Sequence, residues 1–197
     1  MIHKPGKAPN EVTSYRPISL LPVTSKLFEK ILLSRLLSTM SVIPDHQFGF
    51  RPEHATTEQI HRICRVIRNT LETKQYCSSV FLDVQQAFDR VWHKGFLYKI
   101  KLHLPHSYYN ILESYLSDRI FQVKEEDSTS GFHDIKAGVP QGSVLGPVLY
   151  MLFTADLPQT PGVTIATYAG DTAVLACSSC PTEASQILQK SLDDIDQ

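Results

Sequence analysis

Residues 164–177 read TIATYAGDTAVLAC. Two runs rich in β-branched and small apolar residues flank the sequence Ala169-Gly170-Asp171, and such runs on either side of a short turn are typical of a β-hairpin. Gly170 is expected to supply the turn, because glycine adopts backbone angles that other residues avoid. Asp171 then lies at the tip of the hairpin. The two strands are expected at residues 164–168 and 172–177.

A second carboxylate, that of Asp83, lies near the end of another expected strand. The segment Cys77–Val84 is short, β-branched and bounded by polar residues, which predicts a buried strand with Asp83 near its end. Carboxylates at the ends of two strands can converge on a hard cation, so we predict that Asp83 and Asp171 lie on one face of a sheet within about 8 Å. Aspartate is also common at strand ends and in turns because it bonds to the backbone, which leaves a purely structural role open.

Two helices are expected before this strand, after an extended entry rich in proline and glycine. The first begins at Thr24 or Ser25 and runs to about Met40. The second begins at a capping box formed by Thr56 and Gln59. Apolar residues at helical spacing predict the buried stripe of the first helix, which consists of Leu27, Phe28, Ile31, Leu32, Leu36 and Met40.

The remaining elements complete an α+β order. A helix is expected to start around Gln85, followed by a short helix over residues 107–116. Residues 121–124 and 133–136 flank a polar turn and predict a second hairpin, and Gly146-Pro147 precedes a helix over residues 148–156. This order predicts an α+β fold with an antiparallel sheet backed by helices.

The composition is that of a globular protein. The chain has 197 residues, of which 42% are hydrophobic and 20% charged, enough to bury a core. No apolar run approaches the ~20 residues of a membrane helix and no signal-peptide core follows Met1, so we expect a soluble, intracellular protein with no membrane partner. The chain has four cysteines, which are Cys64, Cys77, Cys177 and Cys180. We expect them to be reduced thiols rather than part of a zinc or redox site.

Charge is distributed unevenly along the chain although its net value is only −1. Residues 1–74 contain 11 Lys and Arg against 6 Asp and Glu, a net charge of +5. Residues 75–197 contain 8 against 14, a net charge of −6. A basic first part suits contacts with phosphates, and an acidic second part suits divalent cations.

Five sequence blocks, spread over nearly the whole chain, occur in the order and spacing of a known family. The chain resembles the reverse transcriptases of non-LTR (LINE-type) retrotransposons, especially the Jockey-like group of arthropods. The blocks are Lys4-Pro5-Gly6-Lys7 with Ser14-Tyr15-Arg16-Pro17-Ile18-Ser19-Leu20-Leu21, Gln47-Phe48-Gly49-Phe50-Arg51, Phe81-Leu82-Asp83-Val84 with Ala87-Phe88-Asp89, Ala137-Gly138-Val139-Pro140-Gln141-Gly142-Ser143, and Tyr168-Ala169-Gly170-Asp171.

The resemblance implies an architecture and an activity. It implies one reverse transcriptase domain with a fingers-type subdomain at residues 1–75 and a palm-type subdomain at 76–197, whereas the family's thumb and endonuclease domain are expected to be missing from these residues. The implied activity is RNA-directed DNA polymerisation, in which dNTPs are added to a primer 3′-hydroxyl by phosphoryl transfer at two Mg²⁺ ions. The implied partners are an RNA template, a DNA primer and dNTPs, and the implied compartments are the cytoplasm and nucleus.

The resemblance also implies roles for single residues. Asp83, the backbone carbonyl of Val84, and Asp171 would hold the metal, and both aspartates would be catalytic. Phe88 would be the steric gate that excludes a ribose 2′-hydroxyl, with core packing as the alternative. Contacts with dNTP or template are implied for Arg16, Lys4, Lys7, Phe88, Gln141, Gly142, Arg51 and Tyr168, and for Arg51 a structural ion pair is the alternative.

The chain departs from the family at Gly170. The family has two consecutive aspartates in the hairpin, and Gly170 occupies the position of the one that shares both metals with Asp83. Loss of this carboxylate weakens both metal sites, since bridging carboxylates offset the repulsion between the ions. We therefore expect an impaired copy of the polymerase. Two alternatives stay open: a non-catalytic nucleic-acid-binding remnant of a decayed element, and an unrelated metal-dependent hydrolase that uses Asp83 and Asp171.

Overall fold

A computed structural model describes residues 2–39, 43–125 and 127–196. The chain forms two compact units, each built from two separate segments. Unit 1 contains residues 1–42 and 86–153, and unit 2 contains residues 43–85 and 154–197. The boundary between fingers and palm at residues 75 and 76 is a functional assignment and stays a prediction.

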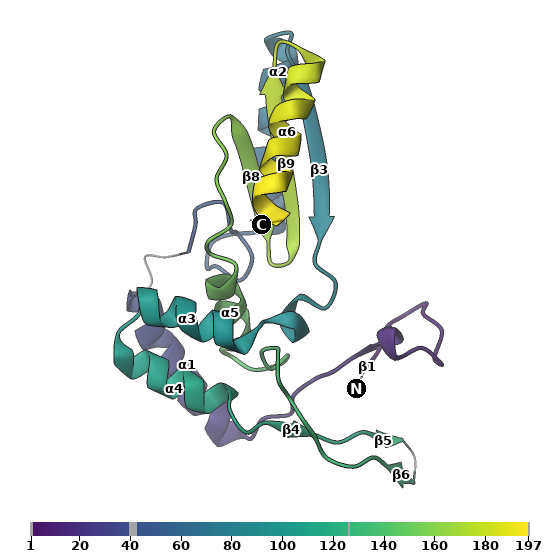
Figure 1. The fold of residues 1–197 in the computed structure, drawn as a ribbon, viewed down its shortest axis with the longest axis vertical. Helices are drawn as coiled ribbons and strands as arrows, with labels where there is room; N and C mark the ends of the chain where they lie inside the picture. The colour runs from purple at the N-terminus through teal and green to yellow at the C-terminus, as the bar shows by residue number, and fades with distance from the viewer. Residues whose placement is uncertain (1, 40–42, 126, 197) are drawn as a thin grey trace. The chain divides into compact units, whose positions relative to one another are not determined.

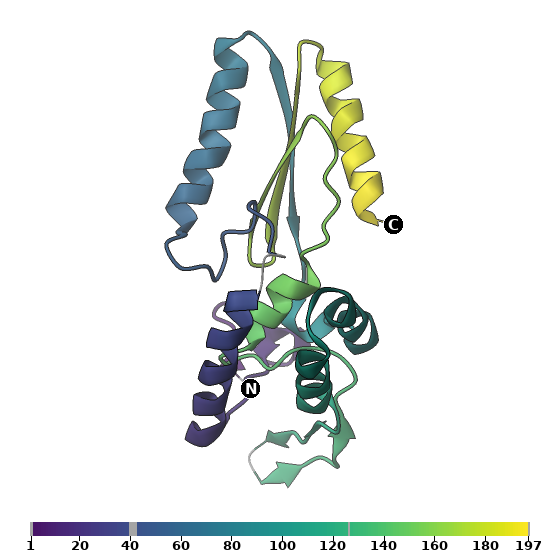
Figure 2. The same cartoon turned by 90° about the vertical axis from the view of Figure 1, so that its left-hand side faces the viewer.

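Unit 2 is a three-stranded antiparallel sheet between two helices. The strands are β3 (Tyr76–Asp83), β9 (Asp171–Ser178) and β8 (Val163–Tyr168), in the spatial order β3-β9-β8. The helices α2 (Thr56–Glu72) and α6 (Pro181–Asp196) cover opposite faces of this sheet (Figures 1 and 2). The predicted hairpin at residues 164–177 is therefore confirmed as β8 and β9.

Successive side chains of the central strand β9 point to opposite faces of the sheet. Each face of the sheet therefore has its own apolar core. On the α2 face, Ala173 and Leu175 pack with Ala166 and with Ile63 and Ile67 of the helix. The α6 face is formed by a second cluster centred on Ile165, Val174, Ala176 and Leu188. β9 is thus buried on both sides.

Two expectations for unit 2 were wrong. The strand that ends at Asp83 is an edge strand, and none of its residues is fully buried. Its apolar sequence reflects a half-covered position between the helices. The helix α6 was not predicted at all, although Pro181 at its first position and the buried Ala184, Leu188 and Ser191 at helical spacing are the usual signals.

The start of α2 also differs from the prediction. Ala55 is the N-cap residue, and its backbone N–H donates to the Glu58 side chain at 2.8 Å. The expected capping box of Thr56 and Gln59 is therefore wrong by one residue. Gln59 is buried and is used elsewhere: its Nε2 donates to the backbone oxygens of His46 at 2.7 Å and Thr167 at 2.9 Å.

Unit 1 packs four helices around an apolar core. They are α1 (Val23–Thr39), α3 (His93–His103), α4 (His106–Leu116) and α5 (Gly146–Phe153). The short α5 is buried on almost every side, which explains its uniformly apolar sequence. The fully buried core side chains include Leu36, Phe96, Ile100, Leu112, Leu145 and Leu149.

The shorter elements of unit 1 form its periphery. The predicted hairpin is confirmed in part. β4 (Ile120–Phe121) pairs with β7 (His133–Asp134) as expected, but β5 (Lys124–Glu125) pairs with β6 (Ser128–Thr129), and residues 135–136 lie outside the strands. The extended entry includes the pair β1 (Ile2–His3) and β2 (Tyr15–Arg16), with the short 3₁₀ helix η1 (Val12–Ser14) between them. None of the helices in the described part of the chain has the length and apolar character needed to cross a membrane.

The buried face of α1 is not the predicted stripe. Leu32 and Leu36 are buried as expected, and Met40 lies outside the described residues. The third buried residue is Glu29, which is only 2% exposed. Its carboxylate accepts hydrogen bonds from Tyr115 Oη at 2.9 Å and from the backbone N–H of Val144 at 2.6 Å. Glu29 therefore lies on the buried face of the helix, and three residues of the expected stripe are exposed, namely Leu27, Phe28 and Ile31.

The segment after β3 is not the predicted α-helix. Gln86 adopts a left-handed conformation with φ of 55°, which interrupts any helix that starts at Gln85. A short 3₁₀ helix, η2 (Ala87–Arg90), follows, and the α-helix α3 begins only at His93.

Candidate active site

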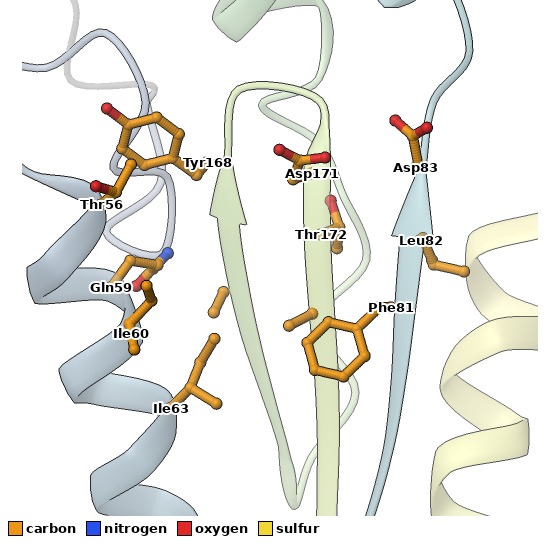
Figure 3. A pocket seen from close by; sticks show the side chains of 12 residues that line it. Thr56, Gln59, Ile60, Ile63, Phe81, Leu82, Asp83, Tyr168, Asp171 and Thr172 are labelled. Atoms are coloured by element: carbon orange, nitrogen blue, oxygen red, sulfur yellow. The ribbon is translucent and has the colours of Figure 1, made fainter. Parts of the chain in front are cut away.

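The carboxylates of Asp83 and Asp171 lie side by side on the sheet of unit 2. Asp83 is the last residue of β3, Asp171 is the first of β9, and the two are direct partners in the antiparallel register. Directly opposed residues in such a pair have Cα atoms about 4.5–5.5 Å apart and side chains on one face. Figure 3 shows the two carboxylates at the same end of neighbouring strands. The prediction that they share one face of the sheet is confirmed, and the predicted separation of their carboxylates, within about 8 Å, stays a prediction.

A cavity of about 360 Å³ adjoins this pair on the α2 side of the sheet. Tyr168, the partner of Asp171 across β8, also lines it. Below the carboxylates the walls are mostly apolar (Figure 3), and the Phe81 side chain remains 72% exposed. The apolar lining includes Ile60, Ile63, Phe81, Ala166 and Ala173. The site thus combines a pair of carboxylates with a cavity that has a mostly apolar lining.

The turn between β8 and β9 has its strained residue one position earlier than expected. Ala169, and not Gly170, takes the left-handed conformation, with φ of 57°. Non-glycine residues pay a steric cost in that region. Gly170 directly precedes Asp171 and is partly buried.

The paired carboxylates of Asp83 and Asp171 suit a hard divalent cation such as Mg²⁺. Within residues 2–39, 43–125 and 127–196, no group of three or more His, Cys, Asp or Glu side chains is placed to share a metal. Mg²⁺ is commonly held by one or two protein carboxylates together with substrate phosphates. Asp83 and Asp171 supply those two carboxylates, and Gly170 offers none.

Unit 1 brings the other blocks together around Gln141. The Gln141 side chain donates to both carboxylate oxygens of Asp89, with N···O distances of 3.4 Å. Its backbone oxygen accepts from the N–H of Ser19 at 2.8 Å. Gly142 has φ of +92°, and an added Cβ would lie 3.2 Å from the Ser19 oxygen. The loop containing Gln141 therefore packs against the Arg16-Pro17-Ile18-Ser19 block.

The segment around Phe88 forms the other side of this cluster. The backbone N–H of Val139 donates to the Phe88 oxygen at 2.8 Å. The Phe88 ring is half-buried and stacks on Tyr150, with centroids 4.9 Å apart. Burial raises the pKa of the neighbouring Asp89, and the charge of Lys4 partly opposes this rise. Phe88 is thus neither free in solvent nor wholly enclosed.

The candidate cations lie in different surroundings. Arg16 and Lys7 are exposed, while the ammonium group of Lys4 donates to the Thr13 oxygen at 2.7 Å. In unit 2, one Nη of Arg51 donates to the backbone oxygens of Pro44 and Gln47, both at 3.2 Å. Arg51 therefore ties together its own loop. This is a structural role, as in the predicted alternative, but its partners are backbone oxygens and not the carboxylate of an ion pair.

The five blocks are divided between the units. Unit 1 contains the first block, the Phe88 segment and the Gln141 loop, whereas unit 2 contains Asp83, the hairpin with Asp171, and the block at residues 47–51. The sequence pattern assigned no role to Gln47 or Gly49, yet both contact the hairpin turn. A glycine between two aromatic residues was the available signal for such a close approach.

Comparison with known proteins identifies the family. The family model described as reverse transcriptase (RNA-dependent DNA polymerase) matches residues 2–197. The chain is 50% identical to the probable RNA-directed DNA polymerase from transposon BS of Drosophila melanogaster, over 98% of this chain and 22% of that protein. It is also 50% identical to the RNA-directed DNA polymerase from mobile element jockey of Drosophila funebris, with the same two coverages. The chain thus spans less than a quarter of these relatives.

Solved structures agree on the fold. Telomerase from Candida tropicalis, in complex with a telomeric RNA fragment, superposes with a TM-score of 0.58 at 12% identity, over 85% of this chain and 30% of that one. The apo telomerase of the same organism gives a TM-score of 0.57 at 17% identity, over 88% of this chain and 36% of that one. The predicted α+β reverse transcriptase fold and the resemblance to Jockey-like elements are both confirmed, and the chain belongs to the reverse transcriptase (RNA-dependent DNA polymerase) family.

Proposed function

We propose that this chain forms the polymerase centre of a non-LTR retrotransposon reverse transcriptase, and that Gly170 impairs it. The proposed reaction adds dNTPs to the 3′-hydroxyl of a DNA primer on an RNA template. The observation that carries this proposal is the direct opposition of Asp83 and Asp171 on one face of the sheet. The names of the relatives, which are RNA-directed DNA polymerases, support the same activity.

Asp83 and Asp171 would hold Mg²⁺, with the backbone carbonyl of Val84 as a third oxygen ligand. Bound Mg²⁺ would supply Lewis acidity at the phosphate and a lower pKa for the primer hydroxyl, with a two-ion arrangement in the intact family site. Both side chains are exposed at the strand ends, so incoming phosphates can complete the ligand set. The full ligand set therefore forms only when nucleotide is bound.

The unit 1 residues would handle the nucleotide and template. Gln141 and Gly142 would contact the base pair that forms, and Phe88 would exclude the ribose 2′-hydroxyl by its bulk. Arg16, Lys4 and Lys7 would bind phosphates of the triphosphate, while Arg51 and Tyr168 of unit 2 would contact template or primer. The subdomains would be fingers at residues 1–75 and palm at 76–197.

Restoration of the missing carboxylate tests this function. Residues 1–197, unchanged or carrying Gly170→Asp, would replace the matching stretch of the jockey polymerase of Drosophila funebris. We expect Gly170→Asp to raise Mg²⁺-dependent primer extension on an RNA template by about tenfold or more, because metal affinity depends steeply on the ligand set. In the restored chimera, Asp171→Asn should abolish extension.

Two outcomes would contradict the proposal in different ways. Equal activity with Gly170 and Asp at this position would mean that Gly170 is not a lesion. If neither chimera extended the primer while the parent jockey polymerase did, the defect would lie elsewhere in the chain. The second candidate function is a nucleic-acid-binding remnant without catalysis, and Gly170 is the observation that favours it. Template binding without extension in the restored chimera would support that alternative.

A further inference from the structure

The loop at residues 44–51 runs along the free edge of β8 in unit 2. The backbone N–H of Phe48 donates to the Thr167 oxygen at 2.9 Å, and the N–H of Thr167 donates to the His46 oxygen at 2.9 Å. Gln47 and Thr167 thereby form a parallel bridge. This single bridge attaches the loop to β8 two residues before the turn of the β8–β9 hairpin.

One buried side chain of this loop holds the turn itself. Gln47 is 4% exposed, and its Oε1 accepts hydrogen bonds from the backbone N–H of Ala169 at 3.0 Å and of Gly49 at 2.8 Å. Its Nε2 donates to the backbone oxygen of Ala169 at 3.3 Å. Both polar backbone groups of Ala169 are therefore bound by one amide, which uses its acceptor and its donor in the only orientation that satisfies both.

Ala169 is a residue that needs such support. It holds the left-handed conformation, with φ of 57°, which is costly for any residue with a Cβ. Strained backbone persists where the surrounding contacts over-determine it. Gln47 is itself buried, so its amide would be left without these partners if the turn moved, and an unsatisfied buried polar group costs free energy.

Gly49 makes this close approach possible. A Cβ added at Gly49 would lie 2.2 Å from the backbone nitrogen of Ala169 and 3.0 Å from its Cα. Neither atom belongs to a flexible side chain, so any larger residue would push the turn away. The Gln47 amide and the absence of a side chain at Gly49 act on the same residue.

We propose that Gln47 and Gly49 are positioning residues that fix the turn at Ala169 and thereby aim Asp171 at Asp83. Asp171 follows the turn directly after Gly170 and opposes Asp83 through the first pair of the β3–β9 register. A change in the Ala169 conformation would therefore rotate the Asp171 carboxylate relative to its partner. The consequence for metal binding rests on the proposed function, whereas the clamp on the turn does not.

The test compares local hydrogen exchange with metal affinity in the 197-residue chain. In Gln47→Met, which keeps the length of the side chain, we expect the Ala169 amide to exchange about tenfold faster, because it loses its buried acceptor. Amides in the middle of β9, such as that of Val174, should keep their rates. Mn²⁺, used alone as a paramagnetic probe, should bind about tenfold more weakly, as expected when a supporting residue is lost.

Matched variants separate positioning from general stability. Gln186→Met changes an exposed glutamine on α6, and Gly131→Ala adds a methyl group at a position with nothing within 4 Å. Neither should change Ala169 exchange or Mn²⁺ affinity, whereas Gly49→Ala should act like Gln47→Met. Gln47→Glu keeps an acceptor for the N–H groups of Ala169 and Gly49 but replaces the donor to the Ala169 oxygen by a second carboxylate oxygen, so it should recover only part of the exchange protection.

The hydrogen-exchange measurement and the Mn²⁺ measurement can each contradict a different part of the proposal. Unchanged Ala169 exchange in Gln47→Met would overturn the clamp. Faster Ala169 exchange with unchanged Mn²⁺ affinity would overturn its role in aiming Asp171. A uniform rise of all exchange rates would reduce Gln47 to a purely structural residue and overturn the proposal. If Mn²⁺ bound at Asp171 neither in the unaltered chain nor in Gly170→Asp, the proposed function would fail, and Ala169 exchange would still decide whether Gln47 holds the turn.

Discussion

Two like charges face each other across β3 and β9, and this arrangement opposes folding when no cation is present. Asp83 and Asp171 are direct cross-strand partners, and like charges in that position destabilise a sheet. We therefore predict that Asp83→Asn raises the free energy of unfolding by about 0.2–1 kcal/mol in EDTA. Chemical denaturation of the chain measures this difference.

Addition of Mg²⁺ should reverse the order of stability. A cation that binds only the folded state stabilises it by mass action, so the unaltered chain should gain more than Asp83→Asn. Asp134→Asn is the control, because Asp134 is an exposed strand residue whose partner is Ile120. Equal stabilisation of all three proteins by Mg²⁺ would contradict a metal site at the pair.

Phe88 offers a second test at the scale of one side chain. We predict that Phe88→Leu, in the chimera restored by Gly170→Asp, increases incorporation of ribonucleotides relative to deoxynucleotides by about tenfold or more, since the smaller side chain leaves room for the 2′-hydroxyl. Single-nucleotide extension with each substrate measures the ratio. Tyr150→Leu removes the same ring stacking without changing the gate. If both variants altered the ratio equally, Phe88 would be a packing residue.

At the scale of elements, the register between β3 and β9 can be checked chemically. Cys77 and Cys177 are direct partners in this register, and antiparallel partners are close enough for a disulfide. We predict that a mild thiol oxidant, such as glutathione disulfide, links Cys77 to Cys177. Burial and its contact with Cys177 raise the pKa of Cys77 to about 11, so the link should form faster at pH 9 than at pH 7.

Peptide mapping would show which cysteines are joined. Cys64 and Cys180 are exposed, and a link to either of them would indicate that the strands are paired differently. A register displaced by two residues would also separate Asp83 from Asp171, so the disulfide is an independent check of the carboxylate pair. Cys177→Ser should abolish the link and leave Cys77 reduced.

The hairpin that carries Asp171 was predicted well from local sequence, whereas the surroundings of elements that depend on distant partners were not. The hairpin of β8 and β9 followed from two apolar runs around a turn, because its contacts lie close together in the chain. The position of β3 at an edge depends on partners that lie 88 to 102 residues later in the chain, so an apolar run alone could not distinguish it from a buried strand. Similarly, the buried Glu29 could not be foreseen, since its partners Tyr115 and Val144 lie in other elements.

In the candidate site, too, some residues were predicted correctly and contacts from distant parts of the chain were not. The resemblance identified Asp83 and Asp171 as partners, and the register brings them together. The strain at Ala169 was assigned to Gly170 because glycine is the usual residue for a left-handed turn. Support from Gln47 permits alanine there, and that support comes from a loop more than a hundred residues earlier in the chain.

At the scale of the whole molecule, the two units carry net charges of opposite sign. Unit 1 has 13 Lys and Arg against 9 Asp and Glu, a net charge of +4, and unit 2 has 6 against 11, a net charge of −5. The net charge of −1 therefore hides a basic unit with the proposed phosphate contacts and an acidic unit with the proposed metal site. A nucleic acid should be held mainly by the first.

This distribution predicts how binding depends on salt. Phosphate contacts release counterions, so the affinity for a primer annealed to its template should fall steeply between low and physiological ionic strength. Arg16→Ala or Lys7→Ala should each lower the slope of log affinity against log salt concentration by about one. Fluorescence anisotropy of a labelled duplex, titrated with the chain at several salt concentrations, measures the slope.

Lys190 provides the control for this prediction. It is exposed on α6, which covers the face of the sheet opposite to α2 (Figure 2). Asp83 and Asp171 line the cavity on the α2 side, so Lys190→Ala should leave the slope unchanged. The comparison is informative because each variant removes one positive charge, and a change in net charge alone would affect all of them alike. Equal slopes for the Arg16, Lys7 and Lys190 variants would therefore refute specific phosphate contacts in unit 1. A slope near zero for the unaltered chain would refute electrostatic binding altogether.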